Sequence, residues 1–234
     1  MTVKIAERLI VALDYSEPVQ AREMVEQLSP LGVGFKAGLE LYMAGGPGLI
    51  TELASRHRLF LDLKFHDIPN TVAAAVRAAA AHGLWMLNVH AAGGRQMMAA
   101  AREALEGFNK RPILLAVTVL TSISESDLSE TGAPGSASER AALLSKLAAE
   151  CGCDGVICSP LEVTAVKEAN SSHFLTVTPG IRPAGEAKSD QARVATPAEV
   201  MRAGGDYLVV GRPITRAADP LQAARMIIAE MEGA

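Results

Sequence analysis

Short apolar segments alternate along the chain with longer segments in which apolar and polar residues recur at helical spacing. The apolar segments are rich in β-branched residues and cover 9–14, 32–38, 59–65, 85–91, 113–120, 155–159, 174–180 and 207–211. The helix-like segments that follow them are 17–28, 47–56, 69–82, 94–107, 138–150, 161–169, 197–204 and 219–232. This pattern predicts eight strands, each followed by a helix.

Regular alternation of this kind predicts an α/β protein in which a single (β/α)8 TIM barrel spans residues 1–234. The strand segments are continuously apolar, as expected when both faces of a parallel sheet are covered. No shift in composition marks a second domain. Two connections, 121–137 and 179–196, are long and rich in Ser, Gly, Pro and charged residues. Long loops in compact domains are usually functional or disordered, and both of these follow strand ends, where barrel active sites lie.

The composition narrows the classes of partner. Hydrophobic residues make up 49% of the 234 positions, which is enough for a large core. The net charge is −4 and no basic tract exceeds a pair of residues, so nucleic acid is not expected as a partner. No apolar run is long enough to cross a membrane, and the N-terminal segment lacks a signal-peptide core. We therefore expect a soluble, cytoplasmic protein with no membrane partner.

The cysteines do not indicate a disulfide framework or a metal site. The chain has three, Cys151, Cys153 and Cys158, and an odd number in a cytoplasmic chain argues against disulfides. No fourth ligand lies near the run "CGCDGVIC", and an apolar stretch separates Cys158 from the other two. We expect small buried hydrophobic residues around a strand.

Polar residues, together with one glycine, gather where the predicted strands end. They are Asp14, Lys36, Asp62, Lys64, Asp67, Asn88, His90, Thr121, Ser122, Arg182, Gly211 and Arg212. Some of them have a structural explanation when taken singly, because Asp14 could cap the helix near Pro18, and Asp67 or Asn70 could cap the helix of 69–82. So many charged residues at the ends of different strands predict an active site at one mouth of the barrel.

The segment "LDLKFHDIPNT" (61–71) indicates the chemistry. Asp62 and Lys64 are two positions apart on a strand and share a face, while Leu61 and Leu63 pack against helices. Carboxylates close to Lys64 favour its charged ammonium form. An ammonium is a proton donor or an electrostatic clamp and is unsuited to Schiff-base chemistry, which needs a neutral amine. The motif therefore indicates delivery of a proton to a developing carbanion.

The segment "VVGRPIT" (209–215) predicts a phosphate site. Barrels often bind phosphate with the loops after strands 7 and 8. Gly211 allows close approach of the backbone, and the guanidinium of Arg212 matches phosphate oxygens. Gln191 and Arg182, in the loop 179–196, could close over a phosphorylated small molecule.

Several segments together resemble one enzyme family. "DLKFHDIPNT" is similar to the D-x-K-x-x-D-I-P-x-T signature of the orotidine 5'-monophosphate decarboxylases. The segments "IVALD", "FKAGLEL", "NVHAAGG", "VTVLTS", "TPGIRPAG....DQARVATP" and "GGDYLVVGRPIT..ADP" also match that family, in order and over nearly the whole chain. The resemblance implies a metal-free and cofactor-free carboxy-lyase that converts orotidine 5'-monophosphate to uridine 5'-monophosphate, the last step of pyrimidine nucleotide synthesis.

The resemblance also implies roles for single residues. Lys64 would protonate C6 of the pyrimidine, Asp62 would face the substrate carboxylate and hold Lys64, and Lys36 would join the charged chain and contact ribose. Asp67 and Thr71 would reach into the partner subunit's site, which makes the enzyme a homodimer. The remaining expected substrate contacts are Asp14 at a ribose hydroxyl, Thr121 and Ser122 at the base, Gln191, Gly211 and Arg212 at the phosphate, Arg182 in the closing loop, and Ile68 and Pro179.

Two alternatives stay open at this point. One is a Mg²⁺-dependent sugar-phosphate decarboxylase or aldolase of the same superfamily, which would place an acidic residue on strand 2, where this chain has Lys36. Glu40 lies nearby but is expected in the following loop. The other alternative is a non-catalytic barrel that binds a phosphorylated ligand. His66, His90 and Trp85 are expected to be structural, with His66 pointing away from Lys64, and the methionines to fill the core.

Overall fold

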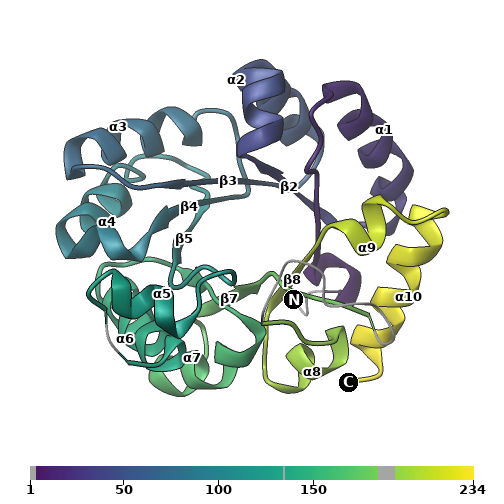
Figure 1. The fold of residues 1–234 in the computed structure, drawn as a ribbon. Helices are drawn as coiled ribbons and strands as arrows, with labels where there is room; N and C mark the ends of the chain where they lie inside the picture. The colour runs from purple at the N-terminus through teal and green to yellow at the C-terminus, as the bar shows by residue number, and fades with distance from the viewer. Residues whose placement is uncertain (1–3, 134, 184–192) are drawn as a thin grey trace.

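The computed structural model describes residues 4–133, 135–183 and 193–234, and these form a closed barrel of parallel strands inside a ring of helices (Figure 1). The strands are β1 (Leu9–Ala12), β2 (Gly34–Gly38), β3 (Leu59–Phe65), β4 (Met86–His90), β5 (Ile113–Val117), β6 (Gly155–Ile157), β7 (Leu175–Thr178) and β8 (Tyr207–Val210). Neighbouring strands pair in chain order, and β8 pairs with β1 to close the barrel. The predicted (β/α)8 fold is confirmed.

The helices of the described residues form the outer layer. They are α1 (Pro18–Leu28), α2 (Leu39–Arg56), α3 (Pro69–Ala80), α4 (Gly94–Glu103), α5 (Glu125–Glu130), α6 (Ala137–Glu150), α7 (Val163–Ala169), α8 (Pro197–Arg202), α9 (Arg212–Thr215) and α10 (Pro220–Glu232). The predicted helix 47–56 is confirmed as the second half of α2, but the first half was not predicted. The helix begins at Leu39 and runs through a kink at Gly46, where φ is 63°. Pro47 follows the kink, so it begins only the second half of α2.

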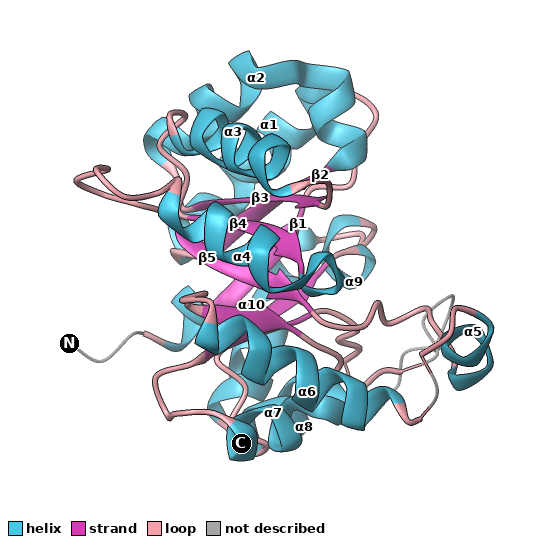
Figure 2. Ribbon diagram, turned by 90° about the vertical axis from the view of Figure 1, so that its left-hand side faces the viewer, coloured by secondary structure: helices cyan, strands magenta, loops and turns pink. Residues whose placement is uncertain are grey.

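Two helices, α5 and α9, lie in segments that were predicted as loops. α5 stands out from the barrel beside the long loops at one end of the molecule (Figure 2). It begins with a capping box between Ser124 and Asp127, a spacing that the sequence does contain. α9 has four residues, which is too short to produce a periodic pattern. The segment 121–137 is therefore partly helical.

Two apolar cores cover the two faces of the barrel wall. The inner core is made of Ile10, Ala12, Phe60, Met86, Leu115, Val117, Ile157, Val177 and Val209. The larger outer core lies between strands and helices. Alternate residues of β3 face opposite sides, since Phe60 belongs to the inner core and Leu61 to the outer one. The same alternation directs Asp62 to the barrel interior and packs Leu63 against the outer core, as predicted.

Close packing at the other end of the barrel accounts for several residues that need no catalytic role. Trp85 packs edge-on against Tyr207, with ring centroids 5.3 Å apart, and the guanidinium of Arg58 lies 4.6 Å from its ring centroid. The structural role expected for Trp85 is confirmed. A Cβ atom on Gly155 would lie 2.3 Å from the carbonyl oxygen of Leu175, so only glycine fits between β6 and β7 there.

The three cysteines are free and buried, as predicted. Burial raises the pKa of the Cys153 thiol to about 12 and also raises that of Cys158. Within the described ranges, no helix combines the length and apolar character needed to cross a membrane.

Candidate active site

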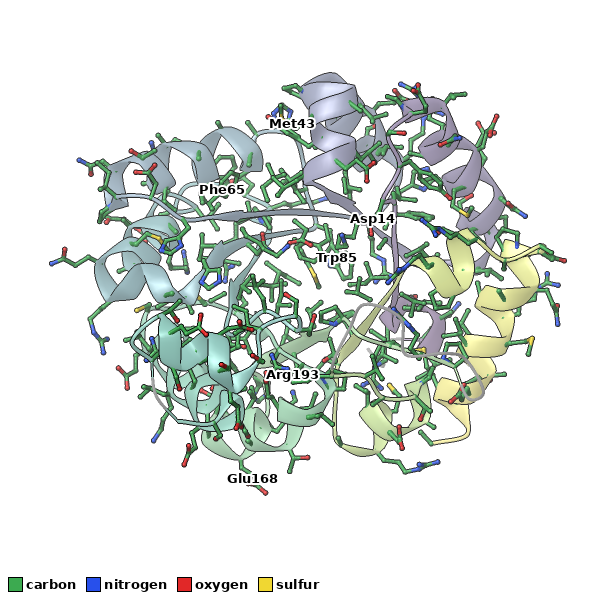
Figure 3. The ribbon with its side chains drawn as sticks, viewed as in Figure 1. Asp14, Met43, Phe65, Trp85, Glu168 and Arg193 are labelled. Carbon is green, nitrogen blue, oxygen red and sulfur yellow. The ribbon has the colours of Figure 1, made fainter. Side chains whose placement is uncertain are left out.

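A cavity of about 680 Å³ opens where the strands end at one mouth of the barrel. Its walls include ten of the predicted site residues: Asp14, Lys36, Asp62, Lys64, Thr121, Ser122, Pro179, Arg182, Gly211 and Arg212. Figure 3 looks down the barrel and shows Asp14 inside the ring of helices, with Met43 and Glu168 at the outer rim. Residues from β1, β2, β3 and β8 therefore meet at one site, although they are far apart in the sequence.

Four charged side chains form a chain of alternating sign along one wall of this cavity. Lys36 Nζ lies 3.3 Å from Asp14 Oδ1 and 3.3 Å from Asp62 Oδ2. Lys64 Nζ lies 2.8 Å from the other oxygen of Asp62, Oδ1. Asp62 is 8% exposed and so holds one ammonium group on each of its carboxylate oxygens inside the barrel.

For Asp62 and Lys36, the neighbouring charges together affect the pKa more strongly than burial does. Burial is the largest influence on Asp62 and raises its pKa, but Lys36 and Lys64, with hydrogen bonds from Lys64 and Asn88, bring the pKa below its usual range. Burial likewise lowers the pKa of Lys36, and Asp62 and Asp14 outweigh it, so the net pKa is raised. Both groups are therefore held in their charged forms at neutral pH.

The backbone at Lys64 is strained. Its φ is 51°, and it is the one non-glycine residue with positive φ in the described part of the chain. The pairing of β3 with β4 shifts register between Leu61 and Phe65. Asn88, in the middle of β4, accepts a hydrogen bond from the Lys64 N–H and donates one to Asp62. Asn88 was predicted only as a strand-end residue with no role of its own, because a cross-strand contact at an irregular register cannot be derived from spacing.

Asp67, Ile68 and Thr71 do not line the cavity. Asp67 and Thr71 are exposed, and 67% of Ile68 is exposed. Asp67 Oδ1 accepts a hydrogen bond from the Ile68 N–H at 2.6 Å. The alternative explanation as helix caps was wrong, because the N-terminus of α3 has no side-chain cap.

Asp14 does not cap a helix either, since the N-cap residue of α1 is Glu17, this end of the helix has no side-chain cap, and Asp14 binds Lys36. Glu40 lines the cavity from the first turn of α2, so its expected place in a loop was wrong. Gln191 lies outside the residues that the structure describes.

The two histidines expected to be structural lie against each other. The rings of His66 and His90 stack with centroids 5.2 Å apart and planes 16° apart, and His90 Nδ1 accepts a hydrogen bond from the Ala92 N–H. Neither histidine lines the cavity. Burial, with the charges of His66 and Lys64, lowers the pKa of His90, which favours the neutral ring that accepts this bond.

A buried ion pair that was not predicted links the loop ends around the cavity. Arg193 pairs with Glu162, which is 1% exposed, and donates a second hydrogen bond to the Leu120 carbonyl oxygen at 2.8 Å. Glu162 also accepts a hydrogen bond from the Ser159 N–H. These contacts join the segment after β7 to the ends of β5 and β6. Nothing in the local sequence around Arg193 indicated a partner 31 residues away.

The described residues contain no cluster of three or more His, Cys, Asp or Glu side chains suited to a metal ion. At the centre of the site, the ammonium of Lys36 occupies the side of Asp62 on which a second carboxylate would be needed to hold a divalent cation. This donor set fits a chain of ion pairs and does not fit a Mg²⁺ centre.

Comparison with known proteins supports the same assignment. A family model described as "Orotidine 5'-phosphate decarboxylase / HUMPS family" matches residues 7–227. The orotidine 5'-phosphate decarboxylase of Alkalilimnicola ehrlichii is 54% identical over 225 residues, 96% of this chain and 96% of that protein. That of Hahella chejuensis is 50% identical over 226 residues, 96% of this chain and 97% of the relative.

Solved structures are similar as well. The crystal structure of orotidine 5'-phosphate decarboxylase from Lactobacillus acidophilus superposes with a TM-score of 0.85 at 41% identity, covering 96% of this chain and 99% of the other. An uncharacterized conserved protein from Geobacillus kaustophilus gives a TM-score of 0.83 at 38% identity, covering 95% and 99% of the two chains. The resemblance expected from the sequence is therefore confirmed, and the chain belongs to the orotidine 5'-phosphate decarboxylase / HUMPS family.

Proposed function

We propose that this protein decarboxylates orotidine 5'-monophosphate to uridine 5'-monophosphate without a metal or cofactor, and that Lys64 protonates C6. The observation that carries the proposal is the Lys64 ammonium, held 2.8 Å from Asp62 on the wall of the cavity, with Lys36 on the other oxygen of Asp62. The relatives at about half identity bear the same activity in their names. The product is a pyrimidine nucleotide, which agrees with a biosynthetic role in the cytoplasm.

The proposed chemistry needs a fixed positive charge more than an electron sink. Loss of CO2 from C6 leaves a carbanion with little delocalisation, so the protein must stabilise the developing negative charge electrostatically. The Lys64 ammonium is already in place and does not have to reorganise as the charge forms. The same group then donates a proton to C6, and the Lys64 amine regains a proton from solvent after product release.

Remote binding supplies the rest of the barrier reduction. Enzymes lower barriers by about 8–23 kcal/mol, and one ion pair cannot account for that amount. Gly211 and Arg212, with Gln191, are proposed to bind the phosphate, and Arg182 to close over it. Thr121 and Ser122 are proposed to border the base and Asp14 a ribose hydroxyl, with Pro179 as a further contact. Binding energy from these groups orients C6 over Lys64.

The Mg²⁺-dependent alternative is less consistent with the site because Lys36 would repel a cation at Asp62. A purely binding role does not explain why two ammonium groups are kept on one buried carboxylate. The first alternative predicts turnover that requires Mg²⁺, and the second predicts no turnover.

The experiment is to measure the turnover of orotidine 5'-monophosphate by loss of ultraviolet absorbance, with excess EDTA present. We expect EDTA-resistant turnover that is lost in Lys64→Ala. The control is Lys146→Ala, which removes an exposed lysine of α6 and is expected to keep the wild-type rate. Absence of turnover, or turnover that requires added Mg²⁺, would contradict the proposal.

We propose further that the active form is a homodimer in which Asp67, Ile68 and Thr71 of each subunit complete the partner's site. Their exposure and their absence from their own cavity support this arrangement. Mixing two inactive variants, Lys64→Ala and Asp67→Ala, tests it. Random pairing makes half of the dimers mixed, each with one complete site, so about a quarter of the wild-type activity should return. No recovery after subunit exchange would contradict shared sites.

A further inference from the structure

Asn88 is a fully buried polar residue whose side chain does not line the cavity. Both ends of its amide are used by the strand that carries Asp62 and Lys64. Oδ1 accepts the Lys64 N–H at 2.8 Å, and Nδ2 donates to Asp62 Oδ1 at 2.7 Å. The orientation of the amide follows from its partners, because a backbone N–H only donates and a carboxylate only accepts.

The register of β3 explains why an amide is needed there. Leu61 pairs with Leu87 and Phe65 with Val89, so β3 advances four residues while β4 advances two. The bulge interrupts the ladder of backbone hydrogen bonds at Lys64 and leaves this residue at a φ of 51°. The Asn88 side chain replaces the missing backbone acceptor and holds the Lys64 N–H in this strained conformation.

The second contact of Asn88 acts on the ion pair itself. Asp62 Oδ1 receives both Lys64 Nζ, at 2.8 Å, and Asn88 Nδ2, at 2.7 Å. Asn88 therefore restrains Lys64 from two sides, directly at its backbone and indirectly through the carboxylate that binds its ammonium. Alanine would satisfy neither partner, and aspartate would set one carboxylate against another.

We propose that Asn88 is a positioning residue that holds the Lys64 ammonium and the Asp62 carboxylate in the geometry required for proton delivery. The proposal rests on the proposed decarboxylation. Because Asn88 is not part of the cavity wall, its replacement should affect the rate of the chemical step more than the binding of substrate. A displacement of about 1 Å at a reacting group can lower the rate about 10²-fold.

The test compares wild type, Asn88→Ala and Asn88→Asp in the same turnover assay, with thermal unfolding to establish that each variant is folded. We expect kcat of Asn88→Ala to fall about 10²-fold while KM changes less than about threefold. Asn170→Ala is the control, since Asn170 is a partly buried asparagine that, like Asn88, makes two side-chain hydrogen bonds, here to Ser145 Oγ and the Val166 carbonyl oxygen, outside the site. It should keep the wild-type kcat.

The pH profile distinguishes positioning from a general loss of stability. In Asn88→Asp, a protonated carboxyl can donate to Asp62 and still accept the Lys64 N–H, whereas the ionised form repels Asp62. The kcat of this variant, relative to wild type, should therefore rise as the pH falls. A kcat of Asn88→Ala within twofold of wild type, a loss confined to KM, or a flat relative pH profile would overturn the proposal.

A structural measurement keeps this inference independent of the proposed activity. A crystal structure of Asn88→Ala, or of Asn88→Ser if the alanine variant does not fold, should show Lys64 displaced from its position in wild type. An unchanged φ of Lys64 and an unchanged Nζ position would overturn the positioning role, whatever the enzyme acts on. Lack of turnover in wild type would count only against the proposed decarboxylation.

Discussion

The backbone strain at Lys64 leads to a prediction whose size can be worked out. At a φ of 51°, an L-residue is disfavoured by about 1–2 kcal/mol, a penalty that glycine escapes. Glycine in turn destabilises the folded state by about 0.5–1 kcal/mol through its freer unfolded chain. Of two substitutions that both remove the ammonium, Lys64→Gly should thus be more stable than Lys64→Ala, by about 0.75 kcal/mol at the midpoints of these two ranges.

Comparing the two variants with each other isolates the strain, because both lose the same ion pair with Asp62. For a chain of this length, 1 kcal/mol corresponds to about 2–4 °C in Tm, so the difference should be about 1–4 °C. The assay is thermal unfolding at one fixed protein concentration, since association would make Tm concentration-dependent.

At a matched control position without backbone strain, glycine should be less stable than alanine. Ala99 lies on the exposed side of α4, where Ala99→Gly should lower the free energy of unfolding by about 1 kcal/mol. If Lys64→Ala proves as stable as Lys64→Gly, or more stable, the protein does not hold residue 64 in the left-handed region. In that case the site does not store backbone strain at its lysine.

Three further predictions concern packing, buried charge and thiol chemistry. Gly155→Ala should lower Tm by several degrees, because the new Cβ would meet a carbonyl oxygen of β7 at 2.3 Å, whereas Gly48→Ala meets nothing within 4 Å and should not. Arg193→Ala should reduce the free energy of unfolding by about 3–5 kcal/mol, measured by urea denaturation, because it strands the buried Glu162 carboxylate. Burial raises the pKa of Glu162 in the folded protein. Stability that depends on a raised carboxyl pKa is lost as the pH rises through that pKa. The stability loss in Arg193→Ala should therefore be larger at pH 8 than at pH 5, and an equal loss at the two pH values would contradict this prediction. A thiol reagent at pH 8 should label none of the buried cysteines until the protein unfolds, because the pKa of Cys153 is raised to about 12; prompt labelling of the native protein would contradict this.

The regular part of the fold could be predicted because it depends on local patterns. Each strand is a short β-branched apolar run, and each long helix has an apolar stripe, so the barrel follows from their alternation. Elements without such a pattern were missed. The first half of α2 precedes Gly46 and Pro47, which interrupt the helical signal, and α9 is shorter than two helical turns.

The identity of the site depended on motif chemistry, which is also local. The spacing of Asp62 and Lys64 places both on the inner face of β3, and the residues after β8 indicated a phosphate site. Contacts across the molecule could not be derived in this way. The pairing of Arg193 with Glu162 joins two loop ends that the chain alone does not bring together.

The barrel, the inward direction of Asp62 and Lys64, and the family follow from local patterns, because alternation and motif spacing act within a few residues along the chain. The geometry at Lys64 depends instead on how distant strands pair in the folded protein. The register shift between β3 and β4 produces its positive φ, and Asn88, 24 residues away, holds that conformation. A bulge depends on how two strands pair, and pairing is set by the closed barrel as a whole, so no local pattern encodes it.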